Sequence, residues 1–195
     1  MAVVCVFCAS SEQIPQHYID LAAEVGTELA RRGHTLVSGG GSVSCMGAVA
    51  RAVRAGGART VGVIPEGLLA WEVADEEADE LVVTPDMRVR KGEMDRRADA
   101  FLTLPGGIGT LEELLEIWVG RVLRMHDKPV VVLDPDGVFA PLRQQVDQLI
   151  ETGFARPSVN DALAWATEVG EAFDLLERHL PVPPPTAAEV LEAEP

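Results

Sequence analysis

The feature that most constrains the fold of this chain is a short apolar run, which leads through a glycine-rich turn into an amphipathic segment. The apolar run covers 100–104 and is bounded by Asp99 and Pro105. Its length and its flanking residues are typical of a buried strand in a parallel sheet. After the turn, apolar residues recur at helical spacing, which predicts a helix. They are Leu111, Leu114, Leu115, Trp118 and Val122.

The rest of the chain repeats this alternation of strand and helix. Further strands are expected at 2–8, 35–37, 60–64, 81–83, 129–133 and 162–166, and further helices at 18–30, up to 55, and at 87–97, 138–150 and 169–180. Such an alternation predicts a doubly wound, mainly parallel sheet of about seven strands with helices on both faces, a Rossmann-like α/β fold. We expect a single domain over 1–180 and a disordered Pro- and Glu-rich tail over 181–195.

Charge limits the kind of partner that the chain can bind. The net charge is −15, with 31 acidic against 16 basic residues. This balance argues against nucleic acid and anionic membranes as partners, because phosphate contacts need basic patches. We therefore expect a small-molecule ligand. The acidic run 72–80 is interpreted as solvated surface, although Glu72 could touch the ligand from a strand's carboxyl end.

Cysteine and histidine usage indicates a cytoplasmic protein without a metal site. The odd set Cys5, Cys8 and Cys45 gives no disulfide framework and fits a reducing compartment. Cys5 and Cys8 have CxxC spacing, but in a strand they point to opposite faces, which favours core packing. The scattered histidines lack metal-ligand spacing. The sequence shows neither a signal peptide nor a membrane span, and we expect no metal and no cofactor.

The turn at 105–113 reads Pro-Gly-Gly-Ile-Gly-Thr-Leu-Glu-Glu and has two interpretations. Glycine N–H groups together with a helix N-terminus can bind an anion such as phosphate. The same residues also fit a capping box, with Thr110 as the N-cap and Glu113 reaching back to it. A carboxylate near a helix start ionises easily, so Glu113 could act as a base or stabilise a cation.

Two further segments could contribute to a ligand site. The glycine turn at 38–42 is either a backbone wall around a sugar and phosphate or a turn that allows close helix–strand packing. Arg90 and Lys91 precede the strand that leads to Pro105, so their helix could return a cation to the glycine loop. A basic pair taken alone is usually solvated. The first strand ends in small polar residues at 9–12 but lacks GxGxxG, which argues against a dinucleotide oxidoreductase.

With these motifs the chain resembles the LONELY GUY (LOG) family, the cytokinin riboside 5′-monophosphate phosphoribohydrolases, long misnamed lysine decarboxylases. The resemblance covers nearly the whole chain up to the Pro-rich tail. Residues 105–113 fit the family pattern PGGxGTxxE, and residues 87–91 fit MxxRK. Two departures stand out. Ser44 and Cys45 occupy positions where the family usually has a glycine and an aliphatic residue, and Ala9 replaces a frequent glycine.

The resemblance implies hydrolysis of the N-glycosidic bond of AMP or of a cytokinin-type purine riboside 5′-monophosphate, giving free base and ribose 5-phosphate. It also implies Arg90 and Glu113 as the catalytic pair, and a homodimer. The substrate-binding residues that we expect are Ser10, Gly40, Gly41, Met87, Lys91, Gly106, Gly107, Gly109 and Thr110.

Two other functions remain as alternatives. One is a non-catalytic nucleotide or molybdenum-cofactor carrier on the same fold, which would need no Arg90 and Glu113 pair. The other is a pyridoxal-dependent decarboxylase, for which the sequence shows no Schiff-base lysine with supporting partners.

Overall fold

The computed structural model describes residues 1–69 and 74–180. The strands are β1 (Val3–Phe7), β2 (Thr35–Ser38), β3 (Thr60–Pro65), β4 (Glu80–Thr84), β5 (Ala100–Thr103), β6 (Val130–Leu133) and β7 (Ala164–Ala166). The helices are α1 (Gln16–Arg31), α2 (Ser44–Ala55), α3 (Met87–Arg97), α4 (Ile108–Val122), α5 (Ala140–Glu151) and α6 (Val169–His179), with short 3₁₀ turns at η1 (Glu66–Leu68) and η2 (Pro157–Ala162). Each expected strand and helix is present, α3 with the expected ends and most of the others with shifted ends. The expected tail and Glu72 lie outside the described residues.

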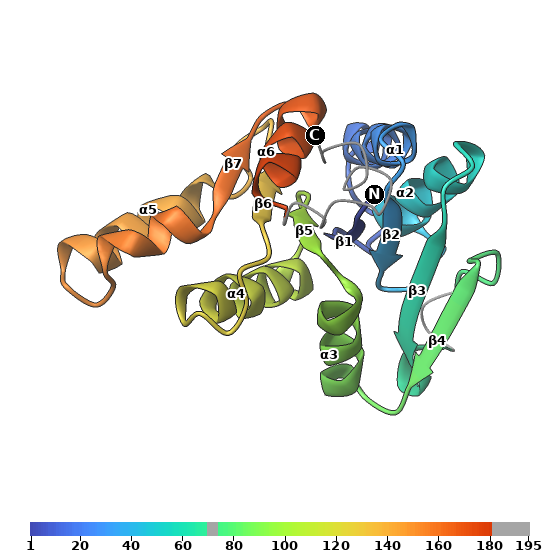
Figure 1. Cartoon of the computed structure of the whole chain (residues 1–195), viewed down its shortest axis with the longest axis horizontal. Helices are drawn as coiled ribbons and strands as arrows, with labels where there is room; N and C mark the ends of the chain where they lie inside the picture. Colours follow the sequence, from blue (N-terminus) through green and yellow to red (C-terminus); the bar gives the residue numbers. More distant parts are fainter. Residues whose placement is uncertain (70–73, 181–195) are drawn as a thin grey trace, which may run out of the picture.

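The sheet is parallel throughout, and its strand order creates a switch point beside β1. The order is β4-β3-β2-β1-β5-β6-β7 (Figure 1). The chain builds outward from β1 to β4 and then returns to add β5 on the other side of β1. In such sheets the ligand crevice lies at the carboxyl ends of the strands where the order reverses. The doubly wound α/β fold expected from the sequence is confirmed.

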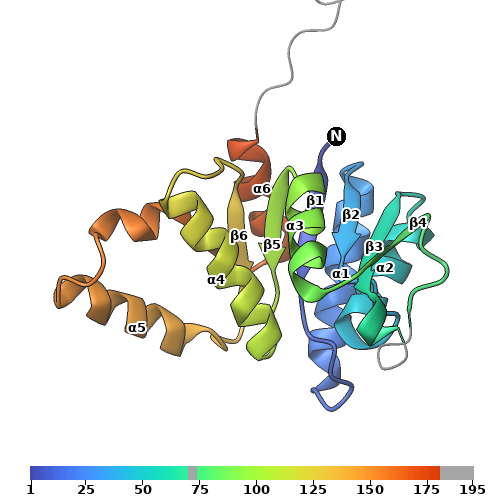
Figure 2. The same ribbon diagram turned by 90° about the horizontal axis from the view of Figure 1, so that it is seen from below.

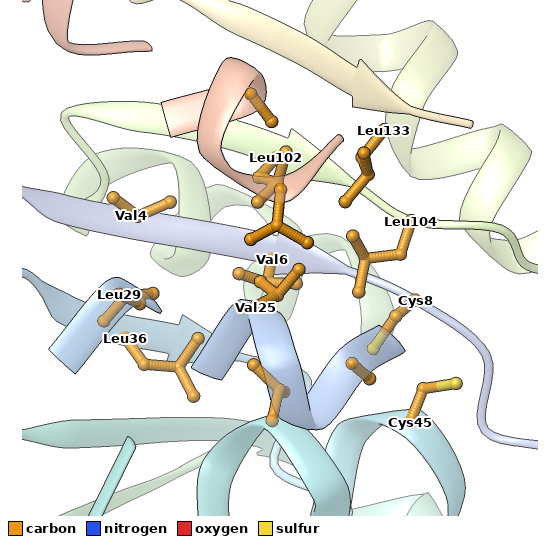
Figure 3. Close-up of a cluster of buried hydrophobic side chains, with 14 of the residues drawn as sticks. Val4, Val6, Cys8, Val25, Leu29, Leu36, Cys45, Leu102, Leu104 and Leu133 are labelled. Carbon is orange, nitrogen blue, oxygen red and sulfur yellow. The ribbon is translucent and has the colours of Figure 1, made fainter. Parts of the chain in front are cut away.

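Helices cover both faces of the sheet (Figures 1 and 2). One face packs against α1, α2 and α6, and the other against α3 and α4. Strand alternation sorts the side chains of β1 between these layers. Val4 and Val6 join the first cluster, where Val25 and Leu29 of α1 lie against them (Figure 3). The parts of the strands that reach the crevice are therefore held rigidly from both sides.

The cysteines pack as the sequence predicts. Cys5 and Cys8 belong to clusters on opposite faces of the sheet, and Cys45 lies in the same cluster as Cys8. All are buried free thiols. In the described part of the chain, no helix combines the length and the apolar character that crossing a bilayer requires.

The acidic run at 72–80 is not solvated throughout, and among its described residues the expectation of a solvated surface is wrong at Asp75. Asp75 has an 8% exposed side chain, and its Oδ2 lies 2.7 Å from Nη1 of Arg54 on α2. Asp79 accepts hydrogen bonds from the backbone N–H and the hydroxyl of Thr60, which fixes the start of β3. Both partners are distant in sequence, so composition alone could not reveal these contacts.

The apolar stripe expected on the central helix is also shifted. In α4 the buried apolar side chains are Leu114, Ile117 and Trp118, whereas Leu115 and Val122 are 41% and 36% exposed. The helix is rotated slightly about its own axis relative to the orientation that its first leucines predict. An apolar strip of α4 thus remains on the surface.

Candidate active site

A cavity of about 540 Å³ opens at the switch point between β1 and β5. Its walls come from the segment after β1, the turn after β5, the start of α3, and side chains of α1 and α2. The residues that line it are Cys8, Ala9, Ser10, Ser11, Ile14, Tyr18, Met46, Leu68, Met87, Arg90, Pro105, Gly106, Gly107, Ile108, Gly109, Thr110, Glu112, Glu113 and Val138. The cavity thus lies where the sheet order predicts a ligand site.

The glycine turn after β5 ends in a helix start without a side-chain cap. The N-cap of α4 is Gly107, and within the described part of the chain no side chain caps the helix there. The expected capping box is wrong, because α4 begins before Thr110 and Glu113 lies beyond the first turn. Thr110 instead packs under Gly106, where an added Cβ would meet its hydroxyl at 2.2 Å. Open first-turn N–H groups and the helix dipole suit an anion at this wall.

Arg90 and Glu113 form a largely buried ion pair at the cavity. Nη1 of Arg90 donates to Oε1 of Glu113 at 3.1 Å, and the two side chains are 7% and 12% exposed. Nε of Arg90 also donates to the carbonyl oxygen of Val63 at 3.0 Å, and Nη2 to that of Gly39 at 3.3 Å. The guanidinium is therefore held by the ends of β2 and β3 as well as by Glu113. The tendency of basic pairs to be solvated does not hold for Arg90.

The carboxyl group of Glu113 takes up a proton more readily in this site than it would in water. Burial raises the pKa of Glu113 above its ordinary value, because the anion loses solvation. The Arg90 guanidinium lowers the pKa, while the neighbouring Glu112 carboxylate raises it. A carboxylate set between a cation and an apolar wall is suited to accept a proton or to stabilise a developing positive charge.

The second glycine turn lies behind Arg90. A Cβ at Gly39 would come within 2.0 Å of Nη2 of Arg90, so only a glycine leaves room for the guanidinium. Gly40 has φ +79, and a Cβ there would lie 3.1 Å from the Cβ of Ile64. Close packing therefore explains this turn better than a wall around the ligand. Gly39 was not singled out from the sequence, because nothing local connects it with Arg90.

The structure brings together most of the expected site residues. Those that line the cavity are Ser10, Met87, Arg90, Gly106, Gly107, Gly109, Thr110 and Glu113. Gly40, Gly41 and Lys91 are not among the lining residues. Lys91 instead forms ion pairs with Glu112 and Glu116 of α4.

Sequence reasoning missed the apolar part of the wall. Tyr18, Met46, Leu68 and Val138 line the cavity, but each fits the pattern of a core residue. Tyr18 also carries a polar contact. Its partial burial and its hydrogen bond to the Asp136 carboxylate raise the pKa of its hydroxyl. Asp136 lies 3.1 Å from Nε2 of His17, so α1 is tied to the loop after β6.

Of the residues that depart from the family pattern, Ala9 lines the cavity, whereas Ser44 and Cys45 are not among the lining residues. Ser44 has φ +52, a left-handed conformation that favours glycine, which is the residue that the family resemblance leads us to expect here. Its hydroxyl donates to the carbonyl oxygen of Ser11 at 2.6 Å and so ties the second turn to the cavity wall. The thiol of Cys45 donates to the carbonyl oxygen of Tyr18 at 3.4 Å.

Comparisons with known proteins point to one family. A family model described as "Possible lysine decarboxylase" matches residues 46–176. The chain is 50% identical over 172 residues to the cytokinin riboside 5′-monophosphate phosphoribohydrolase of Mycobacterium tuberculosis, covering 87% of this chain and 90% of that protein. It is 42% identical over 178 residues to the cytokinin riboside 5′-monophosphate phosphoribohydrolase LOG3 of Arabidopsis thaliana, covering 91% of this chain and 84% of that protein.

Solved structures share the fold. The X-ray structure of TM1055 aligns with a TM-score of 0.70 at 25% identity, over 91% of this chain and 99% of that chain. The molybdenum cofactor binding protein from Rippkaea orientalis aligns with a TM-score of 0.70 at 19% identity, over 91% of this chain and 96% of that chain. At that identity the second likeness concerns the fold alone.

Proposed function

The chain belongs to the LOG family of cytokinin riboside 5′-monophosphate phosphoribohydrolases, and on this premise we propose that it hydrolyses AMP or an N6-modified, cytokinin-type AMP to the free base and ribose 5-phosphate. The observation that carries the proposal is the Arg90–Glu113 pair, which lies in one cavity with the uncapped start of α4. An anion site next to a buried carboxylate matches a substrate with a phosphate at one end and a glycosidic carbon nearby.

The chemistry assigns a role to each member of the pair. Breaking an N-glycosidic bond builds positive charge on the ribose, as in glycoside hydrolysis. Glu113 stabilises that charge and accepts the proton of the attacking water as the C–O bond forms. The base leaves with the electron pair of the broken C–N bond and takes up a proton, so that water is divided between the free base and ribose 5-phosphate. Arg90 bonds to Oε1 of Glu113, so we assign the water to Oε2. Arg90 thereby holds the carboxylate in register with the substrate.

The 5′-phosphate is assigned to the glycine turn. Gly107, Gly109 and Thr110 lie where the first N–H groups of α4 open to the cavity. Binding energy from this remote group positions the reacting carbon, so an unphosphorylated riboside should react poorly. Ser10 and Met87, which line the same cavity, complete the proposed binding set. The reaction as assigned needs no metal or other cofactor, and residues 1–180 supply the whole domain.

The alternative functions have less support. A carrier of a nucleotide or of a molybdenum cofactor would not require a buried Arg and Glu pair at the cavity. A pyridoxal decarboxylase requires a lysine amine at the reacting centre. Lys91 and Lys128 are the lysines of the sequence, and neither lines the cavity. Each is paired with carboxylates instead.

We further propose that the protein is a cytoplasmic homodimer that uses the exposed apolar strip of α4. Val119, Leu123 and Met125 are 52%, 63% and 77% exposed along this helix and its end, which is unusual for large apolar side chains that stay in water. Gly120 lies within the strip, but the residue that packs closely against it is His126 of the same chain. Light scattering at micromolar concentration tests the dimer, and a monomer would refute it.

One experiment tests the activity. The protein is incubated with AMP and, separately, with isopentenyl-AMP in the presence of EDTA, and the products are separated by chromatography. We expect free base and ribose 5-phosphate from at least one substrate, and little base from adenosine, which lacks the phosphate. If neither nucleotide releases base, the proposed activity is wrong.

A further inference from the structure

Two neighbouring cations of α3 face two different sets of carboxylates on α4. Arg90 points into the cavity and meets Glu113. Lys91 follows it, and its Nζ lies 2.6 Å from Oε2 of Glu116 and also meets Oε1 of Glu112. The Lys91 side chain is 21% exposed, while those of Glu112 and Glu116 are 53% and 52% exposed. Lys91 is thus the less accessible centre of a three-residue ion cluster.

This cluster lies close to the site assigned to the substrate. Glu112 lines the cavity together with Glu113. The phosphate of a nucleoside monophosphate carries a charge of about −1.5 to −2 at neutral pH. An uncompensated Glu112 in the same wall would repel that phosphate across a partly desolvated space, where charges interact more strongly than in water. Lys91 supplies a positive charge beside Glu112 without itself lining the cavity.

We propose that Lys91 is a positioning residue that offsets part of the negative charge of Glu112 and Glu116, so that the start of α4 can hold an anionic substrate beside an ionised Glu113. This inference rests on the proposed hydrolysis and gives Lys91 a role without direct substrate contact. It follows from the direction of the side chain, since Lys91 is not among the residues that line the cavity.

The groups around Glu113 determine the direction of the expected effects. Arg90 and Lys91 of α3 lower the pKa of its carboxyl, whereas burial and Glu112 of α4 raise it. The nearest titratable groups of β1 are the thiols of Cys5 and Cys8, which burial keeps neutral by raising their pKa. Loss of the lysine charge removes one lowering influence and leaves the charge of Glu112 without that offset. Both changes raise the pKa of the Glu113 carboxyl.

The test compares variants that change charge and variants that preserve it. For Lys91→Gln we expect the KM for AMP to rise about fivefold to tenfold and the acid limb of the kcat profile to move to higher pH. Lys91→Arg should keep both near the wild-type values. The double variant Lys91→Gln, Glu112→Gln should recover most of the loss, because one positive and one negative charge are removed together. Glu112→Gln alone should move the acid limb to lower pH.

Lys128→Gln is the matched control. Lys128 has a 24% exposed side chain and pairs with Asp95 at 2.9 Å, but it is not among the groups that shift the pKa of Glu113. The inference is overturned if Lys91→Gln leaves KM and the acid limb unchanged, if Lys128→Gln has the same effect, or if the double variant recovers nothing. The last result would identify Lys91 as a structural bridge. Failure of the proposed hydrolysis is a different outcome, in which the wild-type protein releases no base.

Discussion

Nη1 of Arg90 lies 3.1 Å from Oε1 of Glu113, and the two residues belong to helices that begin on either side of β5. The guanidinium is also bonded to the carbonyl oxygens of Val63 and Gly39, so its position depends on β2 and β3 as much as on Glu113. An ion pair buried with such anchors has little freedom to rearrange. Its function should therefore be sensitive to residues that only position it.

Glu113→Gln tests whether the carboxylate acts in the chemistry. The glutamine side chain keeps the size of the original and can still bond to Arg90, but it carries no negative charge. We expect nucleotide binding to persist and turnover to fall by about a hundredfold or more. Binding of AMP measured by calorimetry and base release measured by chromatography separate the two effects.

Glu112→Gln is the control for that substitution, because Glu112 is the adjacent and more exposed carboxylate. It should change turnover far less. Near-wild-type turnover by a folded Glu113→Gln protein that binds AMP would show that the catalytic assignment is wrong.

The pH dependence of turnover should follow the ionisation of Glu113. Burial raises the pKa of its carboxyl, and the mechanism uses the ionised form. As the pH is lowered, activity should therefore be lost at a higher pH than it would be if the essential group were an ordinary, exposed glutamate. The kcat profile with saturating AMP and a ¹³C NMR titration of the labelled glutamates measure this, with Glu113→Gln to assign the signal. A midpoint at or below the value of exposed glutamates would contradict the expectation.

Gly39→Ala should impair catalysis, although Gly39 is not itself among the cavity-lining residues. The added Cβ would approach Nη2 of Arg90 to 2.0 Å and push the guanidinium away from Glu113. A displacement of this size at a catalytic pair should lower kcat/KM by about tenfold or more. Gly170→Ala is the control, because a Cβ there meets open space. If Gly39→Ala is folded and fully active, the position of Arg90 is less critical than the geometry implies.

Asp75→Ala should destabilise the protein, although the residue belongs to an acidic run. The substitution leaves Arg54, whose side chain is 18% exposed, without its closest carboxylate. Breaking a buried ion pair costs about 3–5 kcal/mol, and the partial exposure of Arg54 reduces this to about 2–3 kcal/mol. Chemical denaturation measures the change. Glu76→Ala removes an exposed neighbour and should change the stability by less than about 0.5 kcal/mol.

The sequence by itself determined the elements and the class of the fold. Apolar runs and helical spacing are local patterns, and strands that alternate with helices allow few arrangements besides a parallel, doubly wound sheet. The opposite facing of Cys5 and Cys8 followed from strand geometry in the same way. The motifs at 87–91 and 105–113 also predicted which part of the chain would line a cavity.

Only the tertiary structure decided what each polar residue of those motifs does. Thr110 is a buried packing residue and not a cap, and Asp75 is buried against Arg54. Arg90 lines the cavity, whereas its neighbour Lys91 does not and pairs with Glu112 and Glu116 instead. The physical reason is that the burial of a charge depends on partners that are far away in sequence. Gly39 and Arg90 are 51 positions apart, and no local pattern records that one must lack a side chain to make room for the other.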